Sequence, residues 1–388
     1  MNVVFLSPNF PPQFHHFCAA LRAHGLKALG IGESPAHELA PEVGRSLDEY
    51  FHVADMGRYE ELVRALGYFT WRHGRLDRVD SLNEYWLASE ARLREDFHLA
   101  GPKPAEMTRW RSKSGMREIF QSAGVPCTVG ERVVSPEQVR AFAARVGFPL
   151  VFKPDVGVGA AWTFQVKTPQ ELEETLARPL PVQGYVVERF SEGELVSFDG
   201  LADRDGHIVF CQYTTYSAGV MLLVSEAREV HYFSHREMPP ALEEIGRKVV
   251  AAFGLRERFF HLEAFALPDG KFRALEINIR PPGGFTTDLM NYSCDFDVYD
   301  LWARVISGES FANFKYERKF FCAHAARRNG RQYQLSHEEL VRRLGPALMT
   351  VREVPPVLSG AMGNQMYMIR YPELDALKQA IAWVEARA

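Results

Sequence analysis

The segment Glu276-Ile-Asn278-Ile-Arg280 places a carboxylate, an amide and a guanidinium at alternate positions. On a β-strand these three polar side chains share one face, and the two isoleucines share the other. Carboxylate and amide oxygens are ligands of hard divalent cations such as Mg²⁺, and a guanidinium fork matches phosphate oxygens. The spacing therefore indicates a cation site with an anion beside it.

A hairpin brings a second carboxylate to this face. The tripeptide Pro268-Asp269-Gly270 precedes the strand, and Asp-Gly is a strong signal for a two-residue hairpin loop. With Asp269 and Gly270 as that loop, Glu263 lies opposite Glu276, and His261 lies opposite Asn278. The other face of the hairpin is expected to be apolar and to consist of Leu262, Ala264, Leu275, Ile277 and Ile279.

Glu263 and Glu276 would repel each other across the two strands. Like charges about 4 Å apart cost on the order of 4 kcal/mol at an effective dielectric near 20. A divalent cation offsets this cost; the alternative is a solvated face on which each carboxylate pairs with an arginine or a lysine. Gly283 and Gly284, in the Pro-Pro-Gly-Gly segment that follows, offer backbone N–H groups to a carboxylate or phosphate, which favours the cation.

The hydrophobic pattern around these residues predicts an α/β chain. Strands at 2–6 and 26–31, with a helix at 13–24 between them, form a βαβ unit of a doubly wound parallel sheet. Lys153 closes the buried strand Pro149–Lys153, where a lysine is costly without an anionic partner. Further strands are predicted at 78–82, 185–190, 195–201, 207–213 and 259–267, and helices at 84–96, 112–123, 137–146, 240–253 and 372–386.

The composition limits the partners and the compartment. The 388 residues exceed what one core usually holds, so two or three domains are expected. The net charge of −4 argues against nucleic acid as a partner, and no apolar run is long enough to span a membrane. Five scattered cysteines without a Cys-x-x-Cys pair, and a start without a signal peptide, predict a cytoplasmic protein.

Several segments together resemble the ATP-grasp superfamily, specifically its carboxylate–amine ligases of the L-amino-acid ligase type. Residues 260–284, FHLEAFALPDGKFRALEINIRPPGG, are similar to the magnesium hairpin and phosphate arginine of that family. The other matching segments are 111–126 (the first-lysine helix), 148–160 (the second-lysine strand and glycine loop), 185–193 (the adenine-binding linker), and 81–93 with 98–102 (the end of the preceding domain).

The resemblance implies a multidomain α/β and α+β fold. A doubly wound parallel-sheet domain is expected at 1–105, followed by two α+β subdomains that clamp ATP, at 106–185 and 186–310. A small α+β appendage is expected at 311–388. Its arginines, Arg327 and Arg328, could reach a substrate carboxylate, but surface positions are expected for them.

The resemblance also implies ATP and Mg²⁺ as cofactors, with two metal ions for which Mn²⁺ can substitute. Glu263, Glu276 and Asn278 would hold the metals, and Arg280 would contact the transferred phosphate. Glu276, Asn278 and Arg280 are then the catalytic set. The residues implied in ATP binding are Lys113, Lys153, Gly157, Gly159, Glu188, Arg189, Phe190 and Glu194.

Three positions depart from the family pattern. The loop at 155–161 has fewer glycines than the family's, and Ser112 stands where an aspartate is usual. Leu195 stands where many relatives place a ribose-binding glutamate, so Glu194 or Asp199 would have to substitute for it. None of these positions is a predicted metal ligand.

The implied reaction joins a small-molecule carboxylate to an amine through an acyl-phosphate, with amino acids as expected substrates and a homodimer as the expected assembly. Candidate substrate contacts are His261, His231, Gly283, Gly284 and Asp288, together with Tyr213. Two alternatives stay open. One is a carboxylase of the biotin carboxylase type, against which the thin glycine loop argues, and the other is a regulator that binds ATP without turnover.

Overall fold

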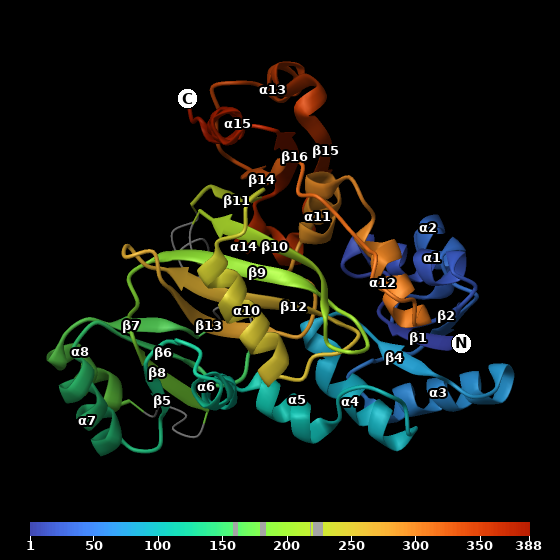
Figure 1. Ribbon diagram of the computed structural model, residues 1–388, viewed down its shortest axis with the longest axis horizontal. Helices are drawn as coiled ribbons and strands as arrows, with labels where there is room; N and C mark the ends of the chain where they lie inside the picture. Colours follow the sequence, from blue (N-terminus) through green and yellow to red (C-terminus); the bar gives the residue numbers. More distant parts are fainter. Residues whose placement is uncertain (158–161, 179–183, 218, 220–227) are drawn as a thin grey trace.

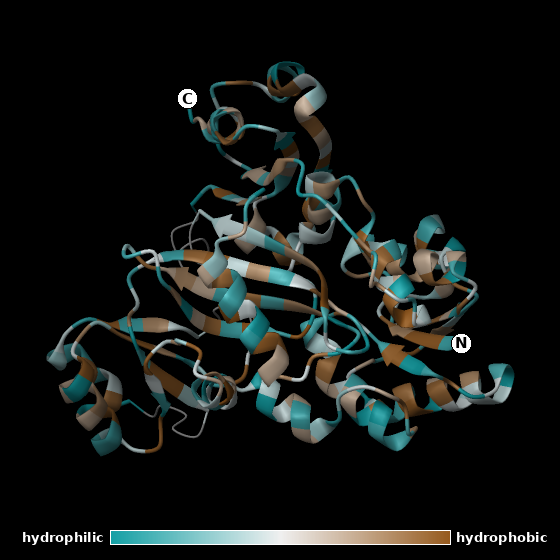
Figure 2. Ribbon diagram, in the orientation of Figure 1, coloured by the Kyte–Doolittle hydropathy of each residue, from teal (hydrophilic) through white to brown (hydrophobic). Residues whose placement is uncertain are grey.

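The computed structural model describes residues 1–157, 162–178, 184–217, 219 and 228–388. It contains a four-stranded parallel sheet, a small four-stranded antiparallel sheet and an eight-stranded antiparallel sheet, which follow one another along the chain (Figure 1). Hydrophobic residues concentrate on the strands and hydrophilic ones on the exposed helices (Figure 2). The predicted fold class, a parallel α/β domain followed by α+β parts, is confirmed.

The parallel sheet has the strand order β3-β2-β1-β4 and helices on both faces. Val3 and Phe5 of β1 pack on the side of α1, and Val4 and Leu6 pack on the side of α3. The doubly wound arrangement was predicted, but β3 and α3 were not. The elements are β1 (Asn2–Leu6), α1 (His15–Ala23), β2 (Lys27–Gly32), α2 (Pro41–Arg45), β3 (Glu49–His52), α3 (Tyr59–His73), β4 (Arg78–Asp80) and α4 (Leu87–Asp96), with short 3₁₀ helices η1 (Pro12–Phe14), η2 (Ala36–Glu38) and η3 (Glu84–Trp86).

The small sheet has the order β5-β8-β6-β7, and α7 and α8 pack on one of its faces. Leu150 and Phe152 of β6 are buried beneath these helices, so the alternate residues Val151 and Lys153 face the other way. The elements are β5 (Gly130–Arg132), α7 (Pro136–Val146), β6 (Leu150–Pro154), β7 (Phe164–Val166), α8 (Pro169–Leu176) and β8 (Tyr185–Arg189).

The large sheet has the order β13-β12-β9-β10-β11-β14-β16-β15. Its last three strands come from the C-terminal residues, which therefore extend this sheet by pairing β14 with β11. Figure 1 shows α10 lying across β9 and β12. The strands are β9 (Glu194–Ala202), β10 (Ile208–Tyr216), β11 (Val230–Ser234), β12 (Arg258–Ala266), β13 (Phe272–Asn278), β14 (Phe321–Arg327), β15 (Leu348–Glu353) and β16 (Gln365–Tyr371).

Helices cover both faces of the large sheet. On one face a core joins α5, α6 and α10 to β9, β12 and β13, and on the other α11 and α14 pack over β11, β14 and β16. The helices are α5 (Pro104–Arg111), α6 (Lys113–Ser122), α10 (Pro240–Ala252), α11 (Thr286–Cys294), α12 (Val298–Ser307), α13 (His337–Leu344), η4 (Gly345–Ala347), α14 (Pro356–Met362) and α15 (Leu374–Glu385). Within the described ranges no helix is long and apolar enough to cross a membrane.

A buried ionic cluster joins the N-terminal domain to the large sheet. Arg94 of α4 donates to Asp80 at 2.8 Å and to Glu90 at 2.6 Å, and Arg258 at the start of β12 lies within 3.4 Å of both carboxylates. All four side chains are at most 2% exposed. A buried charge is stable only when it is paired with a charge of opposite sign. The cluster therefore fixes the position of the N-terminal domain relative to the large sheet.

Candidate active site

The β12–β13 hairpin has the predicted pairing at the carboxylates. Glu263 lies opposite Glu276, and His261 lies opposite Asn278. The predicted turn is wrong, because Leu267 N donates to Lys271 O at 2.8 Å and the loop holds three residues, 268–270. A β-bulge next to Glu263 then restores the register.

The bulge changes the side of one residue. Ala264 pairs with Ala274 and Glu263 with Glu276, so Leu275 has no partner in the ladder. Leu275 lines the cleft beside Glu276, and Ala274 is buried in the core where Leu275 was expected. The prediction that Leu275 belongs to the apolar face is therefore wrong.

The two opposed carboxylates have different surroundings. Burial would raise the pKa of Glu263, but His261 Nε2 lies 3.1 Å from its Oε1, and this contact holds the pKa of Glu263 below its usual range. Burial and the charge of Glu263 raise the pKa of Glu276, whose Oε2 lies 3.8 Å from Lys113 Nζ. Two facing carboxylates with the Asn278 amide on the same face suit a hard divalent cation, which would relieve this repulsion.

His261 is held by a carboxylate behind the metal face. Its Nδ1 lies 2.5 Å from Asp199 Oδ1 on β9, and Ser197 Oγ donates to the other oxygen of Asp199 at 2.6 Å. Burial opposes a charge on His261, but Asp199 and Glu263 together raise its pKa to about 9. Asp199 is fully buried in this network, so it does not serve as the substitute ribose ligand considered above.

Lys153 finds its anionic partner on the neighbouring strand. Its Nζ lies 2.8 Å from Glu188 Oε2, and Arg117 of α6 pairs with the other oxygen of Glu188. Glu188 is 4% exposed, so its carboxylate is committed to two cations rather than to an adenine edge. The amides of Arg189 and Phe190 donate to Val129 O and Pro149 O, which leaves their carbonyl and side-chain groups for a base.

Asp155 ties the two lysine-bearing elements together. Its carboxylate accepts from Ser114 N at 2.8 Å and from Ser112 Oγ at 3.0 Å, so it caps the start of α6. Its backbone carbonyl accepts from Lys113 N at 2.8 Å. Asp155 was not among the predicted site residues; the available signal was the Ser-Lys-Ser start of α6, which needs a capping partner.

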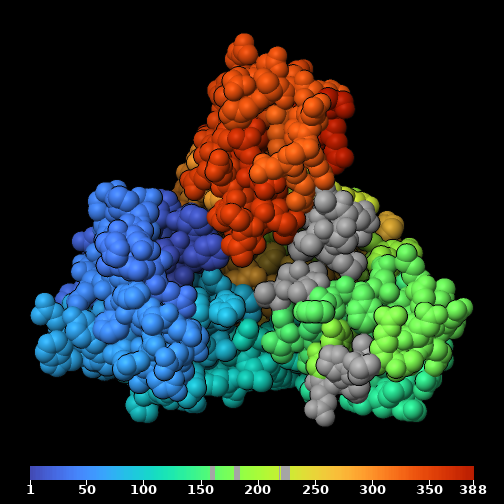
Figure 3. Space-filling model, turned by 180° about the vertical axis from the view of Figure 1, so that it is seen from behind, coloured from blue at the N-terminus to red at the C-terminus, as the bar shows by residue number. Residues whose placement is uncertain are grey.

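Most of the predicted ATP-binding residues line one cleft of about 780 Å³. Figure 3 shows a hollow between the N-terminal domain, the C-terminal residues and the small-sheet residues. The predicted residues in the lining are Lys113, Lys153, Gly157, Glu188, Arg189, Phe190, Glu194, Glu263, Glu276, His231 and Tyr213. Gly159 lies outside the described residues. Asn278, Arg280, His261, Gly283, Gly284 and Asp288 are not in this lining.

Arg280 and the loop after it lie against the N-terminal domain. Arg280 Nη1 donates to Pro281 O at 2.7 Å, and Arg280 Nε lies 3.6 Å from Glu84 Oε2. Gln13 of η1 donates from its amide to Gly284 O. The N-terminal domain therefore holds both the predicted phosphate arginine and the glycine loop. Glu84 and Gln13 were missed because no local pattern relates them to Arg280 and Gly284, which lie 196 and 271 positions away, respectively.

Two other predicted substrate contacts are already partnered. Asp288 is 6% exposed; its Oδ1 accepts from Tyr299 Oη at 2.7 Å, and its Oδ2 lies 3.4 Å from Arg352 Nη1. His231 lines the cleft, with Nδ1 2.8 Å from Glu385 Oε1. Arg327 was expected at the surface, but it is buried and donates to Val384 O at 2.9 Å.

A side chain at Gly284 is expected to be strained. Its φ is +66°, a left-handed conformation that favours glycine, and a Cβ there would lie 1.8 Å from Cε of Met362 in α14, so the end of the methionine side chain would also have to move. Gly284→Ala should therefore lower the free energy of unfolding by roughly 1–3 kcal/mol, measured by urea denaturation. Gly283→Ala is the matched control, because its Cβ would meet no atom within 4 Å. Equal stability of the two variants would contradict the tight packing at Gly284.

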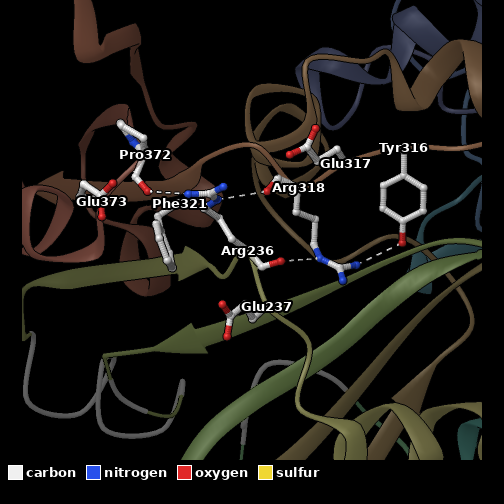
Figure 4. Close-up of a pocket in the computed structure, with 8 residues that line it drawn as sticks. All are labelled: Arg236, Glu237, Tyr316, Glu317, Arg318, Phe321, Pro372 and Glu373. Atoms are coloured by element: carbon white, nitrogen blue, oxygen red, sulfur yellow. Dashed lines mark hydrogen bonds between the residues drawn. The ribbon is translucent and has the colours of Figure 1, made fainter.

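A second cavity of about 620 Å³ lies away from these residues (Figure 4). Arg236 Nε donates to Arg318 O at 3.3 Å, and Arg318 Nε donates to Arg236 O at 3.0 Å. Arg236 Nη1 also donates to Pro372 O at 3.1 Å. None of the predicted site residues lines this cavity, and its arginines join three separate chain segments.

No protein-family model matches the chain. The L-arginine-specific L-amino acid ligase of Bacillus subtilis is 25% identical over 245 residues, which are 58% of this chain and 59% of that relative. The alignments to curated relatives cover between 19% and 59% of the relatives' own lengths.

Solved structures match over almost the entire chain. The L-amino acid ligase from Bacillus licheniformis superimposes with a TM-score of 0.74 at 17% identity, covering 99% of this chain and 96% of the other. The biotin carboxylase domain of the Hydrogenobacter thermophilus 2-oxoglutarate carboxylase, solved with MgADP, ADP and bicarbonate, gives 0.70 at 15% identity, covering 97% and 89%. The chain thus has the ATP-grasp fold and is related in sequence to the L-amino acid ligases.

Proposed function

We propose that the protein is an ATP-dependent carboxylate–amine ligase. The observation that carries this proposal is the pair Glu263 and Glu276, which face each other on one hairpin while Lys113 and Lys153 line the same cleft. Carboxylates suit a divalent cation and lysines suit phosphate oxygens, so the cleft offers both halves of a metal–nucleotide site. The homology to ligases supports bond formation as the use of that nucleotide.

The residues of the chain would act mainly by positioning. Lys113 and Lys153 would hold the phosphates of ATP, while Glu263, Glu276 and Asn278 would hold one or two Mg²⁺ ions, or Mn²⁺ in their place. Bound there, the metal would neutralise phosphate charge. A substrate carboxylate would form a bond to the γ-phosphorus as the bond to ADP breaks, and Arg280 would stabilise the charge on the transferred group.

The second half of the reaction transfers the acyl group to an amine. The amine nitrogen would bond to the acyl carbon of the acyl-phosphate, phosphate would leave, and the nitrogen would lose a proton to solvent. Amino acids are the proposed substrates for both halves. The homodimer remains a prediction.

Phosphate release tests the proposed function. We expect the protein to release phosphate from ATP only with Mg²⁺ and with L-amino acids present, and mass spectrometry should find an amide-linked product of two of them. The control replaces the amino acids by bicarbonate. Release with bicarbonate alone would point to a carboxylase, and magnesium-dependent ATP binding without release under any condition would point to a regulator; either result would overturn the ligase proposal.

A further inference from the structure

Glu84 lies where the N-terminal domain meets Arg280. It begins η3, directly after the carboxyl end of β4. Leu82, two residues earlier, is buried and has a φ of +53°, a left-handed conformation that leucine rarely adopts. The Asn83 side chain accepts from Tyr85 N at 3.1 Å and so caps this turn. Strained backbone of this kind persists where the surroundings hold a side chain in a required place.

The Glu84 carboxylate lies between two guanidinium groups. Its Oε1 accepts from Arg111 Nε at 3.0 Å, and its Oε2 lies 3.6 Å from Arg280 Nε. The three side chains are 12%, 23% and 16% exposed, respectively, so solvent screens them only in part. Arg111 ends α5 and Arg280 follows β13, so the carboxylate of one domain joins two elements of another.

The charges of this trio favour an anion. A single Glu84–Arg280 pair would neutralise Arg280, but two guanidinium groups share the one carboxylate, and the trio keeps a net charge of about +1. Glu84 and Pro281 O contact Nε and Nη1 of Arg280, and among the described residues no acceptor contacts the remaining N–H groups of the fork, which can therefore bind a ligand. Arg280 is therefore held in place and still attracts phosphate.

We propose that Glu84 is a positioning residue, which orients Arg280 toward the phosphate transferred from ATP. The proposal rests on the proposed function, in which Arg280 contacts that phosphate. A free arginine side chain loses rotamer entropy when a ligand fixes it, and Glu84 fixes Arg280 before the nucleotide arrives. Glu84 is therefore expected to affect the rate of phosphoryl transfer, a step that precedes the reaction of the amine.

The test compares Glu84→Gln, Arg280→Gln and the double variant in the phosphate-release assay, with the L-amino acids that support release by the unaltered protein. We expect E84Q to lower kcat roughly 10- to 100-fold and to leave KM for the amine unchanged, because small misplacements of catalytic groups have effects of this size. In the R280Q background, E84Q should add no further loss. Glu95→Gln, an exposed carboxylate on α4, is the matched control and should behave like the unaltered protein.

A binding measurement gives a second readout that needs no turnover. Calorimetry with the magnesium complexes of AMP-PNP and ADP should show that E84Q and R280Q each weaken AMP-PNP more than ADP, since only AMP-PNP carries the γ-phosphate. Glu84→Asp keeps the charge but shortens the side chain by one methylene group, which moves the carboxylate away from Arg280. Its loss of AMP-PNP affinity should lie between that of E84Q and that of the unaltered protein. Thermal melts identify any variant that fails to fold.

Three results would overturn the role of Glu84. E84Q and R280Q could lower kcat additively, E84Q could raise KM for the amine alone, or E84Q could leave both kcat and the AMP-PNP preference unchanged. An unaltered protein that releases no phosphate would defeat the proposed function instead. The nucleotide preference of E84Q would still decide the role of Glu84 in that case.

Discussion

Glu276→Gln should abolish phosphate release while leaving the protein folded. The substitution keeps the size of the side chain but removes one of the two charges that face each other across the hairpin. Loss of a group that stabilises charge at a reacting phosphate typically costs on the order of 10²–10³-fold in kcat. The measurement is the rate of phosphate release with Mg²⁺, ATP and L-amino acids.

The same variant should melt no lower than the unaltered protein in the absence of metal. Burial and the charge of Glu263 both raise the pKa of Glu276, so its ionised form is disfavoured in the absence of metal, and the neutral amide removes both costs. The rise in melting temperature on adding Mg²⁺ with AMP-PNP should disappear. Asp269→Asn makes the same chemical change at the exposed tip of this hairpin and should retain both activity and the ligand-induced rise. Full activity of E276Q would contradict the metal site.

Glu188→Ala should have the largest effect on stability. The Glu188 carboxylate is buried between Lys153 and Arg117, and its removal takes from both cations their shared carboxylate partner at the wall of the cleft. Breaking a buried ion pair from one side costs about 3–5 kcal/mol, because the remaining charge keeps its desolvation cost. We expect a loss of this size in the free energy of unfolding, measured by urea denaturation.

Glu131→Ala is the matched control for this loss. Glu131 lies on the neighbouring strand β5 and pairs with Arg145, but both side chains are at least 36% exposed. A surface pair contributes at most about 1 kcal/mol, so E131A should be nearly neutral. A destabilisation by E188A no larger than that of E131A would contradict a stabilising role for the buried cluster.

The elements with strong periodicity were predictable, and so was the carboxylate pair. Alternation along 276–280 and the Asp-Gly turn were sufficient to place Glu263 opposite Glu276. The loop has one residue more than expected, however, and the bulge at Leu275 compensates for it. The predicted pairing is right because the extra loop residue and the bulge cancel each other. Between them, the side predicted for Leu275 is wrong.

The partners that hold the site were beyond local patterns. Asp199 supports His261 from a strand 62 positions away, and Glu84 reaches Arg280 from another domain. Such contacts depend on how sheets and helices meet, which hydrophobic periodicity does not specify. For Lys153 the sequence was more informative. A lysine at the end of an apolar strand predicts that an anionic partner exists, but it does not identify the residue that provides it.

The continuous eight-stranded sheet has a mechanical consequence. Hydrogen bonds run from β13 through β11 to the C-terminal strands, and the Asp80–Arg94–Arg258 cluster attaches the N-terminal domain, so these parts are joined into one large body. Among the described strands, the small sheet shares none with those parts. It meets them through hydrogen bonds between Ala274 and the chain at 126–128, and through the contacts of Asp155 and Glu188 with α6. Glu263, Glu276 and Arg280 belong to the large body and Lys153 to the small one. A hinge motion of the small sheet relative to the large body would therefore change the distance between Lys153 and the carboxylates, and so open or close the cleft.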